Sequence, residues 1–600
     1  MRGARYAALL AGLLVSLIVG VDLVRAIRPT LLLDADPSWA VPRLVLWCAL
    51  IVSTAGAGGL AAALFFLWSR TSRSRASAEP LPLRRGAIVS LAAAAVLVGV
   101  FVRFVWLERI PLPVWVDDVS LITPALSLEG TWSDFRDSIR PAPFGVEDPY
   151  GTVGVLYLEA HRLLMKLTGT TVAGVRLPAA LAGAVSIVTA ALLGRALLPS
   201  GGGALVALIL AGMRWHLILS RWGWVAMALV PIVDVASLLA LRSRRYASGT
   251  RRMGAALAAT AAGAVIGLGA HVYLAAWVAA GGLLALVLWP RPPNPEKKEG
   301  TGSPLLAGAL FLLGFAATAA PLFLFRENRA APYFARTRDH NVLLEIRRTR
   351  SLLPPLAAAA DSLVAPWLLP DPIPLNDLPG RSRLGWILGI PVAAAMARAL
   401  LNPREDLSAF LLAHGAAAFG ASVVGGQATL PNGFRYAYLT TITAVAAAAG
   451  TLWLVGLVRS SARRAAALAA VGLLAISGAV GARDALFRWG ESRETFDYFH
   501  GPDTLIGRAA LRWERYGRTE ADPSLMHSTI TYGAVRTHGL DPDGPSRYGL
   551  GEATRRTDRA FRIVSTEAAR AAPARVVERV RDAWGREWAV VLATGQLLRR

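Results

Sequence analysis

Apolar runs of about 20 residues recur along the whole chain, and they limit what it can fold into. Wound as a helix, such a run crosses the roughly 30 Å hydrocarbon core of a bilayer. The runs are rich in Leu, Ala and Val; 54% of all residues are hydrophobic and only 17% are charged. A membrane barrel strand would instead be about 10 residues of alternating polarity. The sequence therefore predicts an all-α polytopic membrane protein.

We predict about 13 transmembrane helices from these runs. The predicted spans are 7–26, 42–68, 86–107, 175–197, 203–220, 224–242, 252–270, 272–289, 303–325, 383–401, 406–424, 434–457 and 464–482. The first run follows Arg2 and Arg5, as a signal peptide would. Because Val24-Arg25-Ala26 is a poor cleavage site, we interpret this run as a retained span.

The formal charge of +23 raises the question of nucleic-acid binding. The basic residues are concentrated in short connections between spans, which is typical of the cytoplasmic side of a membrane protein. They are Arg70, Arg73, Arg75, Arg84, Arg85, Arg242, Arg244, Arg245, Arg251, Arg252, Arg291, Lys297, Lys298, Arg459, Arg463 and Arg464. We therefore expect membrane lipids, and no nucleic acid, as partners. The single cysteine, Cys48, excludes an intramolecular disulfide.

Segment 151–167 decides the topology. Its charged residues (Glu159, Arg162 and Lys166) fall on one helical face and its apolar residues on the other, as in a helix lying at the membrane interface. Counting it as a span would move the later basic loops to the outer side. With the segment left out, every basic loop is cytoplasmic, and 108–174, 326–382 and 483–600 are outside.

This map divides the chain into three predicted parts. Residues 1–85 hold two extra spans and a basic cytoplasmic loop, and 86–482 form the main transmembrane part with the outer loops 108–174 and 326–382. Residues 483–600 are polar and of mixed charge, with short apolar runs such as 588–592 that are typical of strands. We expect a small extracytoplasmic α/β domain there, and a multi-pass protein of the bacterial inner membrane.

Two adjacent carboxylates, Asp117 and Asp118, stand in the first outer loop. One interpretation is that either residue caps a helix starting near Val119. The other is that a carboxylate held at the membrane surface accepts a proton from an acceptor hydroxyl.

Several polar residues stand at the outer ends of predicted spans, against the bias that places cations inside. They are Arg176, His216, Arg221, His271, Tyr273 and Arg435. Arginines at such places can anchor a span at the headgroups. Their planar guanidinium groups are equally suited to a lipid phosphate.

The order of these features resembles the GT-C superfamily of polyprenyl-phosphate-sugar-dependent glycosyltransferases. The chain is most similar to bacterial relatives of protein O-mannosyltransferases and of the aminoarabinose transferase that modifies lipid A. The resemblance covers about 86–480. It rests on the acid pair, the amphipathic helix, Arg176-Leu177-Pro178, Trp215-His216 with Ser220-Arg221, Gly267-Leu268-Gly269 with Tyr273, and Pro431-Asn432 with Arg435.

The resemblance implies that Asp117, the first acid of the pair, is catalytic. Asp118 is the alternative if the register of the pair is shifted by one residue, and it stands where the family commonly has Glu. Arg214 replaces a frequent proline, and His271 a small or hydroxyl residue. A sugar would move from a polyprenyl-phosphate donor to a hydroxyl of a protein, lipid or glycan, with inversion. We expect no obligatory metal, although Asp117, Asp118, Glu147 and Asp148 could together hold a divalent ion.

Three other functions remain open from the sequence. A transporter or flippase would place ionisable residues near the bilayer midplane, where only Asp234 falls, and such proteins often contain repeats that this sequence lacks. A polysaccharide polymerase or ligase would share the lipid-linked donor. A non-catalytic membrane scaffold would not require the ordered set of polar residues.

Overall fold

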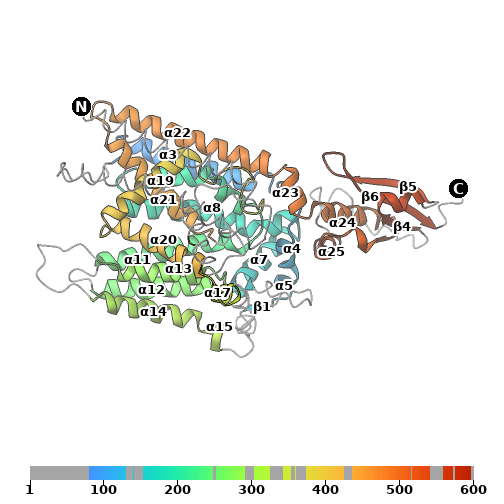
Figure 1. Ribbon diagram of the computed structural model, residues 1–600, viewed down its shortest axis with the longest axis horizontal. Helices are drawn as coiled ribbons and strands as arrows, with labels where there is room; N and C mark the ends of the chain where they lie inside the picture. The colour runs from blue at the N-terminus through green and yellow to red at the C-terminus, as the bar shows by residue number, and fades with distance from the viewer. Residues whose placement is uncertain are drawn as a thin grey trace, which may run out of the picture.

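The computed structural model describes most of the chain from residue 80 onward. The described residues are 80–129, 139–140, 153–246, 252–290, 303–324, 342–352, 359, 373–424, 436–514, 516–538, 540, 559–571 and 574–595. The predicted spans 7–26 and 42–68 lie outside them. The described part is mostly helical, with a small C-terminal sheet, as the sequence predicted (Figure 1).

A bundle of long apolar helices makes up one half of the molecule (Figure 1). Its helices follow the predicted spans closely. They are α3 (Arg85–Phe104), α8 (Val172–Leu197), α9 (Gly202–Gly212), α10 (Arg214–Leu219), η2 (Val225–Ala228), α11 (Leu229–Tyr246), α12 (Arg252–Ala270), α13 (Ala276–Leu288), α14 (Pro304–Ala319), α15 (Pro321–Leu324), α19 (Gly385–Leu401), α20 (Asp406–Val424), α21 (Leu439–Gly456) and α22 (Arg463–Arg483). A short helix, α17 (Val342–Thr349), contacts α20.

Six helices among the described residues are long and apolar enough to cross a membrane. The number is up to seven if α19 and α20, which meet at 105°, are taken as one broken span. Three other predicted spans are represented by the shorter apolar helices α9, α13 and α14. The predicted span 203–220 is divided because Met213 has an extended backbone (ψ 112°), so that α10 starts anew at Arg214.

Small residues allow close helix crossings in the bundle. A Cβ atom added to Gly263 on α12 would lie 1.9 Å from the carbonyl oxygen of Phe311 on α14. One added to Gly314 on α14 would lie 2.1 Å from the carbonyl oxygen of Thr260. Only glycine fits at either place, and such small-residue contacts are typical of helices packed in membranes.

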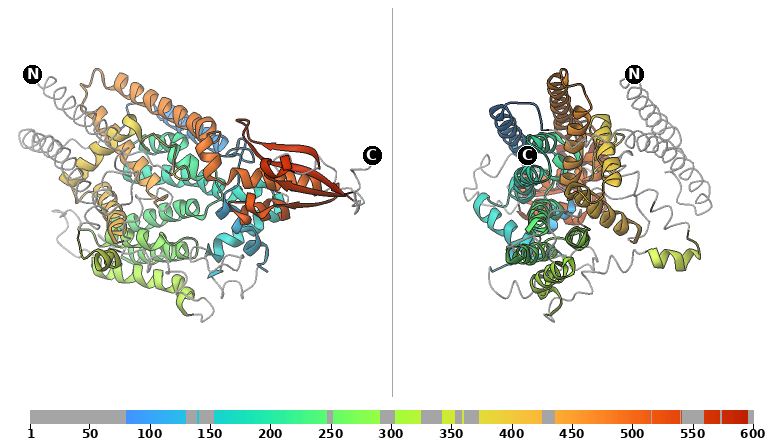
Figure 2. Two further views of the ribbon diagram at one scale, coloured as in Figure 1. Left: turned by 45° about the vertical axis from the view of Figure 1, so that its right-hand side comes forward. Right: turned by 90° about the vertical axis from the view of Figure 1, so that its left-hand side faces the viewer.

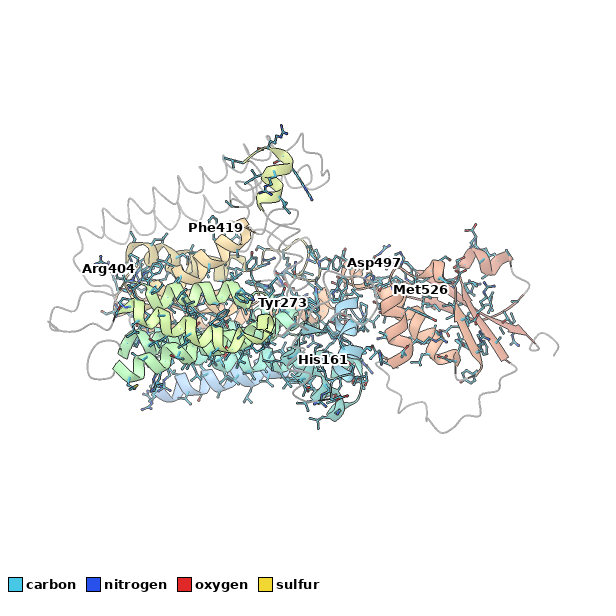
Figure 3. The ribbon with its side chains drawn as sticks, turned by 90° about the horizontal axis from the view of Figure 1, so that it is seen from below. His161, Tyr273, Arg404, Phe419, Asp497 and Met526 are labelled. Atoms are coloured by element: carbon cyan, nitrogen blue, oxygen red, sulfur yellow. The ribbon has the colours of Figure 1, made fainter. Side chains whose placement is uncertain are left out.

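The short basic connections gather at one end of the bundle. Arg245 pairs with Asp406 (3.1 Å), which joins the end of α11 to the start of α20. The Arg244 guanidinium donates to the carbonyl of Trp289, whose indole N–H donates to Pro403 O (both 2.7 Å). The C-terminal domain lies at the other end, as the labels of Arg404 and Met526 in Figure 3 show. This separation is the one that the charge distribution predicts.

The segment between α3 and α8 forms a small layer between the bundle and the C-terminal domain (Figure 1). It contains α4 (Val116–Ser120), α5 (Ile122–Leu126), the paired strands β1 (Ile139–Arg140) and β2 (Val153–Gly154), and α7 (Val155–Thr168). The amphipathic helix predicted at 151–167 is α7. Its Leu163 and Leu167 are exposed, as an interfacial helix requires, whereas Arg162 is buried and pairs with Glu159 (2.7 Å).

The C-terminal region begins where α22 continues into a π-helix, η4 (Asp484–Trp489). The other elements are α23 (Arg493–Tyr498), α24 (Gly501–Glu514), β3 (Arg518–Ala521), η5 (Pro523–Leu525), α25 (Thr529–His538), β4 (Arg559–Val564), α26 (Thr566–Ala571), β5 (Arg575–Arg581) and β6 (Glu587–Gly595). The strands form one sheet in the order β3-β4-β6-β5, parallel only between β3 and β4 (Figure 2). Apolar residues of α24 pack on it through Ile506, Ala509 and Ala510.

A labelling experiment tests which end of the bundle faces outward. In a Cys48→Ser background, a cysteine replacing the exposed Ser524 should react with an impermeant thiol reagent once the outer barrier is permeabilised. A cysteine replacing the exposed Arg404, at the basic end, should react only after the inner membrane is lysed. The positive-inside bias is the physical reason for this expectation. The reverse labelling pattern would invert the topology.

Candidate active site

Helix α4 carries both candidate acids. It begins at Val116, directly after Trp115, and not near Val119 as the capping interpretation assumed. Asp117 and Asp118 therefore lie within the helix, and the N-cap position belongs to Trp115, whose indole has no acceptor atom for capping. The side chain of Asp117 lies outside the described residues. Asp118 is fully buried, which is rare for a carboxylate unless its surroundings compensate the charge.

Asp118 is buried among polar groups of α7 and α8. Its charge acts on the Arg176 guanidinium and on the Tyr157 hydroxyl. Burial, and then the charge of Asp118, raises the pKa of Tyr157 well above its ordinary value, so this phenol stays neutral. The hydroxyl donates to the carbonyl of Gly223 (2.6 Å), which fixes α7 to the loop before η2.

His161 lies one turn beyond Tyr157 on α7. Its ring meets the ring of Tyr157 edge to face at 5.7 Å, and it is fully buried. Burial lowers the pKa of His161 to about 4, so the imidazole is neutral at physiological pH. Figure 3 places His161 and Tyr273 at the end of the bundle that faces the C-terminal domain. The spacing of Tyr157 and His161, four residues on a helix, was a signal that the sequence analysis missed.

Arg176 holds the chain that leads to α4. Its Nη1 donates to the carbonyl of Leu107 (2.9 Å) and its Nη2 to that of Pro113 (2.6 Å), and the side chain is fully buried. The prediction placed this residue at the headgroups or on the donor. The structure shows that its guanidinium closes the turn between α3 and α4.

Arg221 has a similar place at the end of α3. Its Nη1 donates to the carbonyls of Val102 and Arg103, and its Nη2 to those of Val105, Trp106 and Ile110, at 2.7–3.2 Å. The last carbonyls of a helix have no partner within it, so this guanidinium caps α3. A role in donor binding stays a prediction, and in this conformation both terminal nitrogens already donate to backbone.

A capping role for Arg221 predicts that Arg221→Ala lowers the stability of the protein, whereas a role in donor binding predicts that it lowers donor affinity. Loss of the cap should lower stability by roughly 1.5–3 kcal/mol, the usual scale for a hydrogen bond to a charged group. Donor binding alone predicts about tenfold weaker donor use with unchanged stability. Thermal unfolding and apparent donor affinity, measured on the same preparation, separate the two. An unchanged unfolding temperature would exclude the capping role.

His216 lies inside the bundle and belongs to a second polar network. Its Nδ1 is 2.6 Å from Nη2 of Arg103, and its Nε2 is 2.8 Å from the Ser186 hydroxyl. All three side chains are fully buried, so the network joins α3, α8 and α10. The sequence motif Trp215-His216 thus belongs to a network inside the bundle, and a role of His216 in substrate binding stays a prediction.

His271 and Tyr273 follow the end of α12 and lie against the start of α7. The Nε2 atom of His271 is 2.8 Å from the carbonyl oxygen of Thr318. A Cβ atom added to Gly154 would lie 1.6 Å from the His271 carbonyl oxygen, so the two backbones touch. Tyr273 is half-buried and packs against the apolar cluster that contains Val119.

The structure therefore brings together part of the predicted set: Asp118, Arg176, His271 and Tyr273. His216 and Arg221 support the site from the bundle, and Arg435 lies outside the described residues. Glu147 and Asp148 lie outside them too. Within the described ranges, no group of three or more His, Cys, Asp and Glu side chains is placed to hold a metal ion.

No protein-family model and no curated protein matches this chain. Among solved structures, ArnT from Cupriavidus metallidurans in the apo state has TM-score 0.48 and 14% identity, over 85% of this chain and 98% of that one. Its structure bound to undecaprenyl phosphate has TM-score 0.45, 15% identity and the same coverage. Archaeal oligosaccharyltransferase AglB from Archaeoglobus fulgidus, with an inhibitory peptide and a dolichol-phosphate, has TM-score 0.47 and 14% identity, over 80% and 70%.

With identities of 14–15% and TM-scores of 0.45–0.48, these similarities assign no role to any residue of this chain. The role of each residue must therefore come from this chain's own geometry.

Proposed function

We propose that the protein is a membrane glycosyltransferase that moves a sugar from a polyprenyl-phosphate carrier to an acceptor hydroxyl on the outer side of the membrane. The observation that carries the proposal is the position of α4. Two adjacent acids lie on α4, at the end of the bundle that faces the C-terminal domain. This helix therefore lies between the apolar spans and a polar domain. A lipid-linked donor and a polar acceptor would meet at that boundary.

In the proposed reaction, the acceptor oxygen attacks the anomeric carbon of the donor sugar. The bond between this carbon and the phosphate oxygen breaks, and polyprenyl phosphate leaves with the electron pair. Asp117, or Asp118 in the alternative register, accepts the proton of the acceptor hydroxyl. Direct displacement inverts the anomeric configuration. As written, the reaction needs no metal ion.

The leaving phosphate requires positive charge, and the same end of the molecule supplies it. Asp484, almost fully buried, is surrounded by Arg214 (3.4 Å), Arg381 (2.6 Å) and Arg488 (3.6 Å). Arg381 and Arg488 are 40% and 43% exposed, so part of each guanidinium faces solvent. Arg214 also pairs with Asp377 (2.6 Å), so three arginines stand beside two acids and leave a net positive charge suited to a phosphate. Arg435 remains a further candidate for this role.

One observation favours the rival function, a transporter. Asp234 is buried in α11 and accepts hydrogen bonds from Thr189 on α8 (2.6 Å) and Thr441 on α21 (3.3 Å). Ionisable residues inside a membrane often mark a transport path. Here the two hydroxyls already hold the carboxyl between three helices, which is equally what a structural contact requires.

Product binding tests the proposed function without knowledge of the sugar. Undecaprenyl phosphate should raise the unfolding temperature of the purified protein in a saturable way, because a ligand that binds the folded state stabilises it. Undecaprenol, which lacks the phosphate, is the matched control and should shift it less. Equal shifts for the two lipids would contradict a site built for a lipid phosphate.

A further inference from the structure

The C-terminal domain makes direct contact with the segment that begins α4. The Trp115 ring lies nearly parallel to the rings of Tyr498 (centroids 5.3 Å apart, 15°) and His500 (5.1 Å, 12°). Phe499 contacts the same ring at 5.4 Å. Trp115 is the last residue before the acid helix. The position of this indole therefore sets where α4 starts.

Helix α24 also holds the backbone just ahead of Trp115. The Val114 amide donates to the Thr504 hydroxyl (3.3 Å), a contact between residues 390 positions apart. The same hydroxyl donates to the carbonyl of His500 (3.1 Å). Arg508, one turn further, donates to the carbonyl of Leu112 (3.3 Å). Leu112 and Val114, two alternate residues of the segment before α4, are thus both held by one helix of the C-terminal domain.

Apolar packing adds a third contact. Val114 and Val119 are fully buried in a cluster that includes Ala534 and Val535 of α25. The carboxylate of Asp503 on α24 accepts from the amides of His527 and Ser528 (2.9 and 3.1 Å), just before α25. The two helices of the domain are therefore tied to each other where they meet α4.

The turn that presents these groups is held in an unusual backbone conformation. His500 has φ 53°, a region that residues other than glycine rarely adopt. Such a conformation persists only where the surroundings determine it. The stacking of His500 on Trp115 and its carbonyl contact with Thr504 are two such determinants.

A helix as short as α4 does not keep its place by itself. It has five residues, and helices of this length are unstable without tertiary contacts. Catalytic groups must be held within about 0.5 Å of their working geometry. We propose that the C-terminal domain is a positioning element of the active site, which holds the acid helix α4 in register through Trp115 and Thr504. This inference rests on the proposed function.

Thr504 offers the sharpest test, because two variants separate the hydroxyl from the shape of the side chain. Thr504→Val removes the acceptor for the Val114 amide at nearly constant volume, and Thr504→Ser keeps it. We expect Thr504→Val to lower kcat for sugar transfer by roughly tenfold or more, with little change in donor KM, since small misplacements of reacting groups are costly. Thr504→Ser should restore most of the rate.

Two controls exclude a general loss of folding. Thr594→Val removes a hydroxyl of the same domain that donates to the carbonyl of Ala560, far from α4, and should leave kcat unchanged. In an Asp117→Asn background, Thr504→Val should cause little further loss, because misplacing an acid that is already disabled has no further effect. Equal losses in both backgrounds, or a wild-type rate in Thr504→Val, would overturn the inference.

Hydrogen exchange tests the contact between α24 and the segment before α4 without an activity measurement. The amides of residues 112–120 should exchange faster in Thr504→Val than in wild type or Thr594→Val, because their contact with α24 is weakened. If wild-type protein transfers no sugar, the proposed function fails, and this exchange still tests the contact. Unchanged exchange over 112–120 would overturn the positioning role.

Discussion

Asp117→Asn should reduce the rate of sugar transfer by about 10²–10⁴, the usual scale of general acid–base catalysis. The amide keeps the size of the carboxyl but cannot accept a proton from the acceptor hydroxyl. Stability should be nearly unchanged, because α4 begins at Val116 and Asp117 is not its N-cap residue. The rate is measured with labelled sugar on a polyprenyl-phosphate donor and purified protein in nanodiscs.

Asp118→Asn is the matched comparison, since it makes the same chemical change one residue along the helix. Asp118 is buried beside Arg176, so we expect its loss to affect stability as well as rate. If Asp117→Asn keeps more than about half of the wild-type rate, Asp117 is not the base. A large loss of rate with unchanged stability in Asp118→Asn would then transfer the role to Asp118.

Asp377→Ala should destabilise the protein by about 3–5 kcal/mol, the usual cost of breaking a buried ion pair by removing one partner, because the buried Arg214 then keeps only Asp484, at 3.4 Å, as a charged partner. Asp377 is fully buried, and both of its carboxylate oxygens accept from Arg214, at 2.6 and 3.2 Å. This pair fastens the segment before α19 to the start of α10. Unfolding in mixtures of mild detergent and sodium dodecyl sulfate gives the change in stability.

Arg381→Ala provides the contrast, because it removes an ion pair in which the arginine is 40% exposed. Exposed pairs contribute about 0–1 kcal/mol, so its effect should be much smaller. Replacing both partners, as Arg214→Met with Asp377→Leu, should recover part of the stability lost in Asp377→Ala, because no unpaired charge then remains between them. Equal losses of stability in Asp377→Ala and Arg381→Ala would show that burial does not determine how much each ion pair contributes to stability.

The helices could be predicted from the sequence because hydropathy is a local property. The run at 464–482 became α22, and 252–270 became α12, almost residue for residue. The division of 203–220 could not be predicted, because it depends on the backbone of one residue, Met213, and on a partner of Arg214 that lies 163 positions away.

The site could be predicted only in part, for the same reason. The acid pair was evident because two carboxylates in a loop between apolar runs stand out. The partners of Arg176 and Arg221 were not evident, because they are backbone carbonyls at the end of α3 and in the turn between α3 and α4, and every residue has a carbonyl. The contact between Val114 and Thr504 joins residues 390 positions apart and leaves no local trace in the sequence.

Sugar transfer by the wild-type protein tests the central claim most directly. Purified protein in nanodiscs is incubated with a panel of polyprenyl-phosphate sugars and with acceptors that carry free hydroxyls, without any nucleotide sugar. We predict that at least one donor is consumed, that polyprenyl phosphate is released, and that the new glycosidic bond has the inverted anomeric configuration. Movement of intact lipid-linked sugar across the membrane, with no transfer from any donor, would contradict the account and favour a transporter.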